Sequence, residues 1–292
     1  MSTPLTTSPF LVPSDGSFRL ADRSTSLPKD HPACKNRKRQ LSQAKEELDE
    51  LQHRFFADGS QALLLVFQAM DAAGKDSTIR RVLSGINPAG FRVHSFGAPS
   101  SLERGHDFLW RLNTRLPERG RIGVFNRSHY EEVLVVRVNP GFLAGQGIDP
   151  SGDLDALFDQ RFQAIRSWES HLKSSKTTVV KFFLNVSREE QRKRLLARLD
   201  EPSKNWKFNG SDLDTRAKWD QYMAAYQDAL NETSTADSPW FCIPADDKKS
   251  MRVVVAQELV KILSALNPKY PVMPEDERAK MGEYRRILEA DQ

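Results

Sequence analysis

Residues 62–78 read ALLLVFQAMDAAGKDST, and this segment carries the strongest indication of the fold. It begins with six apolar residues, the length and character of a strand buried on both faces of a parallel sheet. Small residues follow and end at Gly74 and Lys75, and residues 76–83 have the character of a helix. A strand, a small-residue loop, Gly-Lys and a helix form the arrangement in which backbone N–H groups and the positive end of a helix bind phosphate.

The segment departs from the standard pattern G-x-x-x-x-G-K-[ST] in two ways. Ala69 stands at the first glycine position, and Asp76 follows Lys75, so that the hydroxyls of Ser77 and Thr78 are displaced by one and two residues. The alternative is an ordinary strand-to-helix turn that contains Gly-Lys by chance. We call residues 69–74 the phosphate loop.

Composition sets broad limits on the class of protein. Of 292 residues, 28% are charged and 39% hydrophobic, which is ordinary for a globular protein. No apolar run approaches the roughly 18 residues of a membrane span, and the first ten residues lack the features of a signal peptide. Lys and Arg exceed Asp and Glu by only 43 − 39 = 4. We therefore expect a cytoplasmic location, without a membrane or nucleic acid as a partner, and no disulfide or metal site at the two distant cysteines.

Predicted strands and helices alternate along the chain, which indicates an α/β domain with a mainly parallel sheet. We predict three layers, α/β/α, around five strands at residues 62–67, 91–96, 121–125, 177–185 and 240–243. The predicted helices are residues 31–57, 76–83, 101–116, 154–173, 187–200, 211–231 and 249–266. Residues 1–30 are expected to form an extended or partly disordered arm, residues 31–268 the catalytic domain, and residues 269–292 a tail.

Several further segments agree in order and spacing with one known family. They are MDAAGKDSTI (70–79), GINPAG (85–90), FNRSHYEEVL (125–134), WKF (206–208), Trp240 and IPADDK (243–248). With these motifs the chain resembles the second polyphosphate kinase family, most closely its class III group of one-domain enzymes. The resemblance covers about residues 30–268, and the combination of motifs is highly specific although each motif alone is not.

The resemblance implies a P-loop kinase-like fold, with Walker A as its phosphate loop and a helical lid at about residues 187–212. It also implies phosphoryl transfer from inorganic polyphosphate to nucleoside mono- and diphosphates, with Mg²⁺ or Mn²⁺ as cofactor, in a homodimer or homotetramer. Where other classes of the family carry Asp, this chain has Asn126, and Glu131 is expected to compensate. That pattern goes with acceptance of both AMP and ADP.

Three residues are predicted to be catalytic. Lys75 is expected to cradle the transferred phosphoryl group, because a cation at a helix start is otherwise poorly placed. Asp71 is interpreted as a metal ligand, with a turn-stabilising Asp as the alternative. Arg127 is expected to reach the phosphates of the acceptor nucleotide, with a surface ion pair to Glu131 or Glu132 as the alternative. His129 is predicted to be structural, because a phosphate nucleophile is already ionised near pH 7.

The remaining predicted site residues fall into three groups. The predicted nucleotide-binding residues are Asn87, Gly90, Asn126, Arg127 and Glu131. The predicted metal ligands are Asp71 and Glu131. The predicted polyphosphate-binding residues are Ala72, Ala73, Gly74, Lys75, Asp76, Ser77, Thr78, Arg194, Arg198, Lys204 and Lys207. Asp76 could equally cap a helix, and the basic residues of 187–207 could equally form a solvated helix face. Trp206 and Phe208 are expected in the core of the lid, with stacking on a base or on the lid as the alternative.

Two other functions stay open from sequence. An ordinary ATP-dependent nucleotide kinase could share the fold, and replacing ATP by polyphosphate as donor discriminates the two. A regulator that binds polyphosphate or a nucleotide without turnover is the second alternative. The presence together of Asp71, Lys75 and Arg127 argues against that regulator.

Overall fold

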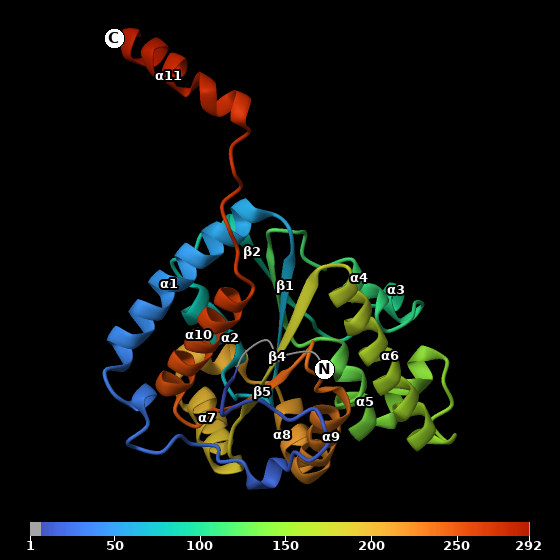
Figure 1. Ribbon diagram of the computed structural model, residues 1–292. Coiled ribbons are helices and arrows are strands. Elements are labelled where there is room, and N and C mark those ends of the chain that lie inside the picture. Colours follow the sequence, from blue (N-terminus) through green and yellow to red (C-terminus); the bar gives the residue numbers. More distant parts are fainter. Residues whose placement is uncertain (1–6, 292) are drawn as a thin grey trace.

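Five parallel strands, ordered β2-β3-β1-β4-β5, form the sheet of the computed structural model, which describes residues 7–291 (Figure 1). The strands are β1 (Ala62–Gln68), β2 (Phe91–Ser95), β3 (Ile122–Asn126), β4 (Thr177–Asn185) and β5 (Trp240–Pro244). Every residue of β1, β3 and β4 is buried, as expected for strands covered on both faces. The predicted five-stranded α/β sheet is confirmed.

Helices cover both faces of this sheet. They are α1 (Arg37–Asp58), α2 (Lys75–Leu83), α3 (Ser101–Arg104), α4 (Trp110–Asn113), α5 (Val135–Val138), α6 (Leu154–Ser174), α7 (Arg188–Asp200), α8 (Ser211–Ala217), α9 (Trp219–Thr233), α10 (Lys248–Ala265) and α11 (Glu275–Ala290). Figure 1 shows α1, α2 and α10 on one side of the sheet and α4, α5 and α6 on the other, so the predicted three layers are present.

The strand register brings the ends of neighbouring strands together. Phe67 of β1 pairs with Asn126 of β3, and Gln68 pairs with Phe183 of β4. The loops that follow β1 and β3 therefore begin side by side. Carboxyl ends of parallel strands are where open α/β sheets bind ligands, and here that edge holds the phosphate loop.

Three predicted helices are broken by local capping. The segment 101–116 contains two short helices, because Gly105 ends α3 and the Asp107 side chain accepts a hydrogen bond from the N–H of Leu109. The segment 211–231 divides at Lys218, whose backbone leaves helical geometry between α8 and α9. The segment 31–57 has a short 3-10 helix at Pro32–Cys34 and becomes α-helical only at Arg37, after Asn36 in the left-handed conformation (φ 43°).

The two ends of the chain differ in their packing. Leu11 forms an antiparallel bridge with Phe241 of β5, and Phe18 and Leu20 are buried in the core. At the other end α11 buries no residue and projects away from the sheet (Figure 1). Residues 1–6 of the predicted arm and residue 292 of the predicted tail lie outside the described residues. Between residues 7 and 291, no helix combines the length and apolar character needed to cross a membrane.

Candidate active site

A cavity of about 1380 Å³ lies at the carboxyl edge of the sheet, between the phosphate loop and the lid. Its walls include most of the residues predicted from the sequence. They are Asp71, Ala72, Ala73, Gly74, Lys75, Asp76, Ser77, Asn126, Arg127, Glu131, Arg194, Arg198, Lys204 and Lys207. The phosphate loop after β1, the end of β3, α7 and the segment after α7 thus meet around one space.

The backbone of the phosphate loop is held in an unusual conformation. Ala72 and Gly74 both have positive φ, at 60° and 111°. The left-handed region is uncommon for a residue with a Cβ such as Ala72, and it turns successive peptide N–H groups toward one side. An added Cβ at Gly74 would lie 3.4 Å from Cε of Lys248. The loop therefore has the alternating geometry of an anion-binding nest, closely covered by a lysine.

Lys75 is the first residue of α2, and its side chain is buried. Its Nζ donates a hydrogen bond to the carbonyl oxygen of Ala69, at 2.6 Å. Burial lowers the pKa of Lys75 and the charge of Arg127 lowers it further, while Asp71 and Glu131 act in the opposite direction. A desolvated ammonium beside another cation is stabilised strongly by an incoming anion.

Asp71 and Arg127 form an ion pair across the cavity. Nη2 of Arg127 donates to Oδ1 of Asp71 at 3.0 Å. Arg127 follows β3 with φ 63°, and its N–H donates to the carbonyl oxygen of Phe67. That bond holds the backbone of Arg127 at the end of β1, where its guanidinium reaches Asp71 of the phosphate loop. Within residues 7–291, Arg127 forms no ion pair with Glu131 or Glu132, the partners named in the alternative.

Carboxylate and amide oxygens gather at the ends of β1 and β3. Nε2 of Gln68 donates to Oε1 of Glu131 at 3.1 Å, and Nδ2 of Asn126 donates to Oδ1 of Asp76. The other amide oxygens, Oε1 of Gln68 and Oδ1 of Asn126, are buried and have no hydrogen-bond partner in the described structure. Unpaired buried oxygens are costly unless a cation or water satisfies them.

These oxygens fit a magnesium ion that shares its coordination with substrate. Residues 7–291 contain no group of three or more His, Cys, Asp or Glu side chains that could hold a metal by themselves. Mg²⁺ is usually bound by one or two carboxylates together with waters and substrate phosphates. Asp71 and Glu131, both on the cavity wall, supply carboxylates of that kind.

Three of the predicted lid cations line the cavity, and their contacts with the protein leave some of their N–H donors unused. Nη1 of Arg198 donates to Oδ2 of Asp212 at 2.8 Å and to the carbonyl oxygen of Lys207. Lys204 pairs with Glu201 at 2.5 Å, and Nζ of Lys207 lies 5.0 Å from the centre of the Trp206 ring. Trp206 is 79% exposed, so the prediction that it belongs to the lid core is wrong.

Arg194 also borders the cavity, but its guanidinium faces the protein. The side chain is 9% exposed, and its N–H groups donate to Glu190 and to the carbonyl oxygens of Ala72, Ala73, Ala245 and Asp246. With its five N–H donors engaged by these acceptors, Arg194 does not fit the predicted role of a polyphosphate ligand.

Three other predicted site residues lie away from the cavity. Asn87 caps the turn before β2, and Gly90 packs against Gln52 so closely that an added Cβ would be 1.5 Å from Nε2. Both precede β2 and so lie at the opposite edge of the sheet, which does not fit the predicted nucleotide contact. Thr78 is buried in α2, and the cavity wall does not include it.

The structure adds cations to which the sequence analysis gave no role. Lys248 lines the cavity, and burial, followed by the charges of Arg194 and Arg252, lowers its pKa to about 8. Arg252 donates to Oγ of Ser77 at 3.1 Å. Lys248 and Arg252 are four residues apart at the start of the helix after β5. Two cations one helical turn apart, directly after a buried strand, are the sequence feature that could have predicted a phosphate-binding role for them.

The chain matches the family model described as Polyphosphate kinase 2 (PPK2) over residues 33–271. It is 51% identical over 245 residues to an ADP-polyphosphate phosphotransferase of Rhodopseudomonas palustris, covering 83% of this chain and 84% of that protein. It is 45% identical over 224 residues to an AMP/ADP-polyphosphate phosphotransferase of Meiothermus ruber, covering 77% and 80%.

A solved structure shows the same fold. The crystal structure of Polyphosphate Kinase 2 from Arthrobacter aurescens superposes with a TM-score of 0.81 at 38% identity, over 94% of this chain and 95% of that one. The P-loop kinase-like fold implied by the sequence motifs is therefore confirmed, and the chain belongs to the polyphosphate kinase 2 family.

Proposed function

We propose that this protein transfers a phosphoryl group from inorganic polyphosphate to nucleoside mono- and diphosphates, making ADP from AMP and ATP from ADP. The observation that carries the proposal is the single cavity in which the phosphate loop, Lys75, the Asp71–Arg127 pair and the lid cations converge. The similar R. palustris and M. ruber proteins are named ADP-polyphosphate phosphotransferase and AMP/ADP-polyphosphate phosphotransferase, which supports polyphosphate and these nucleotides as the substrates.

The reaction exchanges one P–O bond for another. A terminal phosphate oxygen of the acceptor nucleotide attacks the terminal phosphorus of the polymer, and the bridging P–O bond behind that phosphorus breaks. The nucleotide gains one phosphate and the polymer loses one. The same exchange run backwards returns a phosphate to the polymer, so the reaction is reversible.

The protein's task in this exchange is positioning and charge stabilisation. Lys75 and the N–H groups of the phosphate loop stabilise the negative charge on the transferred phosphoryl group. Arg127, held by Asp71, orients the phosphates of the acceptor. His129 takes no part, because it is fully buried and burial lowers its pKa. The attacking phosphate oxygen is already ionised near pH 7 and needs no base.

Asp71 and Glu131 are proposed to hold Mg²⁺, or Mn²⁺ in its place, with Asn126 beside them. When bound, the ion neutralises charge on the phosphates of donor and acceptor and holds them together. The ion pair with Arg127 offsets the negative charge of the Asp71 carboxylate beside the phosphate loop.

The polymer is proposed to extend from the phosphate loop over a basic surface formed by Arg80, Arg81, Lys248 and Arg252. Arg252 joins this surface to the loop through Ser77. Burial lowers the pKa of Arg252, and the charges of Arg81 and Arg80 lower it further. Within residues 7–291 none of the four cations forms an ion pair within 4.0 Å. Like charges without carboxylate partners favour a polyanionic ligand.

The donor test separates this proposal from the two alternatives. Purified protein is given AMP and either polyphosphate or ATP, and ADP is quantified by chromatography. Faster ADP formation with polyphosphate supports the proposal, whereas turnover with ATP alone indicates an ordinary nucleotide kinase. Binding of both ligands without product would indicate a regulator.

A cytoplasmic location and a homodimer or homotetramer are also part of the proposal. Light scattering of the purified protein tests the oligomeric state.

A further inference from the structure

Arg194 has no donor left for a substrate. Its Nε donates to Glu190 at 2.7 Å, one turn earlier on α7. Nη1 donates to the carbonyl oxygens of Ala73 at 2.6 Å and Ala72 at 3.3 Å. Nη2 donates to the carbonyl oxygens of Ala245 and Asp246, both at 2.8 Å. A guanidinium has five N–H groups, and each has an acceptor within the protein.

The Ala73 carbonyl that Arg194 binds belongs to the peptide group whose N–H is that of Gly74 and is not engaged within the loop, whereas the N–H of the preceding peptide group, that of Ala73, donates to the carbonyl oxygen of Met70. A peptide group whose N–H points at an anion has its oxygen on the other side, and an oxygen turned inward would repel the anion. Ala72 adopts φ 60°, a conformation that costs free energy for a residue with a side chain. The two hydrogen bonds from Nη1 compensate that cost and fix the orientation of the loop.

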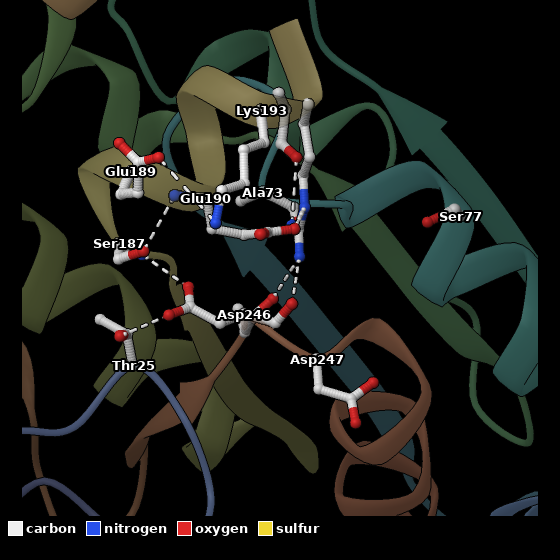
Figure 2. Close-up of polar contacts among 12 residues, drawn as sticks. Thr25, Ala73, Ser77, Ser187, Glu189, Glu190, Lys193, Asp246 and Asp247 are labelled. Atoms are coloured by element: carbon white, nitrogen blue, oxygen red, sulfur yellow. Dashed lines mark hydrogen bonds and ion pairs between the residues drawn. The ribbon is translucent and has the colours of Figure 1, made fainter. Parts of the chain in front are cut away.

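Nη2 of Arg194 binds the segment after β5, and hydrogen bonds to the Asp246 side chain hold that segment in place. Oδ1 of Asp246 accepts a hydrogen bond from the N–H of Ser187, the residue before α7, at 2.7 Å. Oδ2 of Asp246 accepts one from Oγ1 of Thr25, also at 2.7 Å. Figure 2 shows Asp246 between Thr25 and Ser187 on one side and the contacts that reach Ala73 and Glu190 on the other.

Arg194 therefore connects three parts of the molecule with its one planar group. The phosphate loop after β1, the start of the lid at α7, and the loop between β5 and α10 all contribute acceptors. The group is nearly buried, so these bonds are shielded from competing water. Lysine could not replace it, since an ammonium presents its donors from a single atom.

We propose that Arg194 is a positioning residue for phosphoryl transfer, which fixes the carbonyls of Ala72 and Ala73 so that the phosphate loop presents its N–H groups to the transferred phosphate. This inference rests on the proposed function and assigns Arg194 to the rate of the transfer step, not to the affinity for the polymer. Interactions that are realised fully only in the transition state change kcat more than binding.

The test compares Arg194→Lys and Arg194→Ala with Arg192→Ala. Arg192 is an exposed arginine of the same helix, paired with Glu189, so its loss removes the same charge without touching the phosphate loop. The measurements are kcat and KM for polyphosphate at saturating ADP, and tripolyphosphate binding by calorimetry. We expect both Arg194 variants to lose about a hundredfold in kcat, the effect typical of misplacing one preorganised donor. KM and tripolyphosphate affinity should change less than threefold.

Chemical rescue distinguishes positioning from general damage to the fold. Added guanidinium ion, at concentrations that leave thermal unfolding unchanged, should restore kcat of Arg194→Ala at least tenfold and should not restore Lys75→Ala. If Arg194→Ala does not fold, Arg194→Lys and Asp246→Asn carry the test. The latter replaces one acceptor oxygen by an amide donor, so it cannot keep both bonds to Ser187 and Thr25, and it should lower kcat about tenfold at unchanged KM.

A rise of tenfold or more in KM or in the tripolyphosphate dissociation constant, with kcat preserved, would make Arg194 a ligand of the polymer and overturn the proposal. Unchanged kinetics in Arg194→Lys would overturn it as well. An inactive wild-type protein would instead refute the proposed function. The calorimetric comparison still decides in that case, because a ligand role requires weaker tripolyphosphate binding and a positioning role does not.

Discussion

At the residue scale, burial and neighbouring charge give the site its chemistry. Lys75 is buried beside Arg127 and held by the carbonyl oxygen of Ala69, so its charge is available to a phosphate without rearrangement of solvent. The negative charge of Asp71 is offset by its ion pair with Arg127. In the proposed reaction, each of these groups acts on charge that develops on the transferred phosphoryl group, so each is expected to matter mainly in the transition state.

Replacing Lys75 by Ala, or Asp71 by Asn, should each lower turnover with polyphosphate and ADP at least about a hundredfold, since each removes a charged stabiliser worth roughly 2.7–4 kcal/mol. Lys173→Ala is the control, because Lys173 is a half-exposed residue of α6 that pairs with Asp237 at 4.0 Å. Initial rates of ATP formation provide the measurement. Near-normal turnover in either site variant would show that the site is assigned wrongly.

Lys248 gives the binding of polyphosphate a predicted pH dependence. Its pKa is lowered to about 8, mainly by burial and then by Arg194 and Arg252. The ammonium is charged below that value and loses its charge as the pH rises through it. KM for polyphosphate should therefore rise between pH 7 and pH 9. In Lys248→Arg this rise should be largely absent, because a guanidinium does not titrate there.

Measurement of KM at several pH values, in the wild type and in Lys248→Arg, checks this prediction. The terminal phosphates of the substrates titrate below this range, so they do not imitate the effect. An equally steep rise in both proteins would remove Lys248 as its cause.

At the element scale, a buried ion pair joins three elements beneath the site. Nζ of Lys181, in the middle of β4, donates to Glu169 of α6 at 2.5 Å and to the carbonyl oxygen of Thr233 in α9 at 2.7 Å. The hydroxyl of Tyr130 donates to the other oxygen of Glu169 at 2.8 Å. Tyr130 lies between Arg127 and Glu131 in sequence, so this network also fixes the segment that carries two proposed site residues.

Lys181→Met should destabilise the fold by about 3–5 kcal/mol, because it leaves the Glu169 carboxylate buried without a cation. Adding Glu169→Gln should return part of that loss, because the remaining group is neutral. Urea unfolding of both single variants and the double variant measures the coupling. Single-variant losses that simply add in the double variant would show that the pair is not coupled.

The sequence predicted strands better than helices. An uninterrupted apolar run such as that of β1 or β4 has few alternatives, and all five strands were found near their observed bounds. Helix ends depend on single side chains, such as the hydrogen bond of Asp107 that separates α3 from α4. Polar periodicity alone does not reveal such interruptions.

At the scale of the whole molecule, the phosphate loop could be predicted because it is contiguous in sequence, and Arg127 because it follows a buried strand. The sequence predicts Arg194 to be a polymer ligand, because the spacing of charges on a basic helix does not show which side chains face the rest of the protein. The loop carbonyls that engage it lie more than 120 residues away in sequence. Asn87 and Gly90 precede a strand, and only the topology reveals that this end faces away from the cavity.

Removing residues 275–292 should leave the free energy of unfolding within about 0.5 kcal/mol of the full chain, because α11 buries no residue in the described structure. Its apolar residues Met281, Tyr284, Ile287 and Leu288 are all exposed. Urea unfolding at two protein concentrations is the measurement. A larger loss that depends on concentration would show that a second copy covers this helix.

The measurement that tests the central claim most directly is a coupled assay of purified protein with polyphosphate, Mg²⁺ and either AMP or ADP, with no ATP added. The account predicts ATP from ADP and ADP from AMP, with both activities lost in Asp71→Asn. ATP from ADP alone would keep polyphosphate as the donor and contradict the dual acceptor range inferred from Asn126 and Glu131. No product with either acceptor, while ATP phosphorylates AMP, would contradict polyphosphate as the donor.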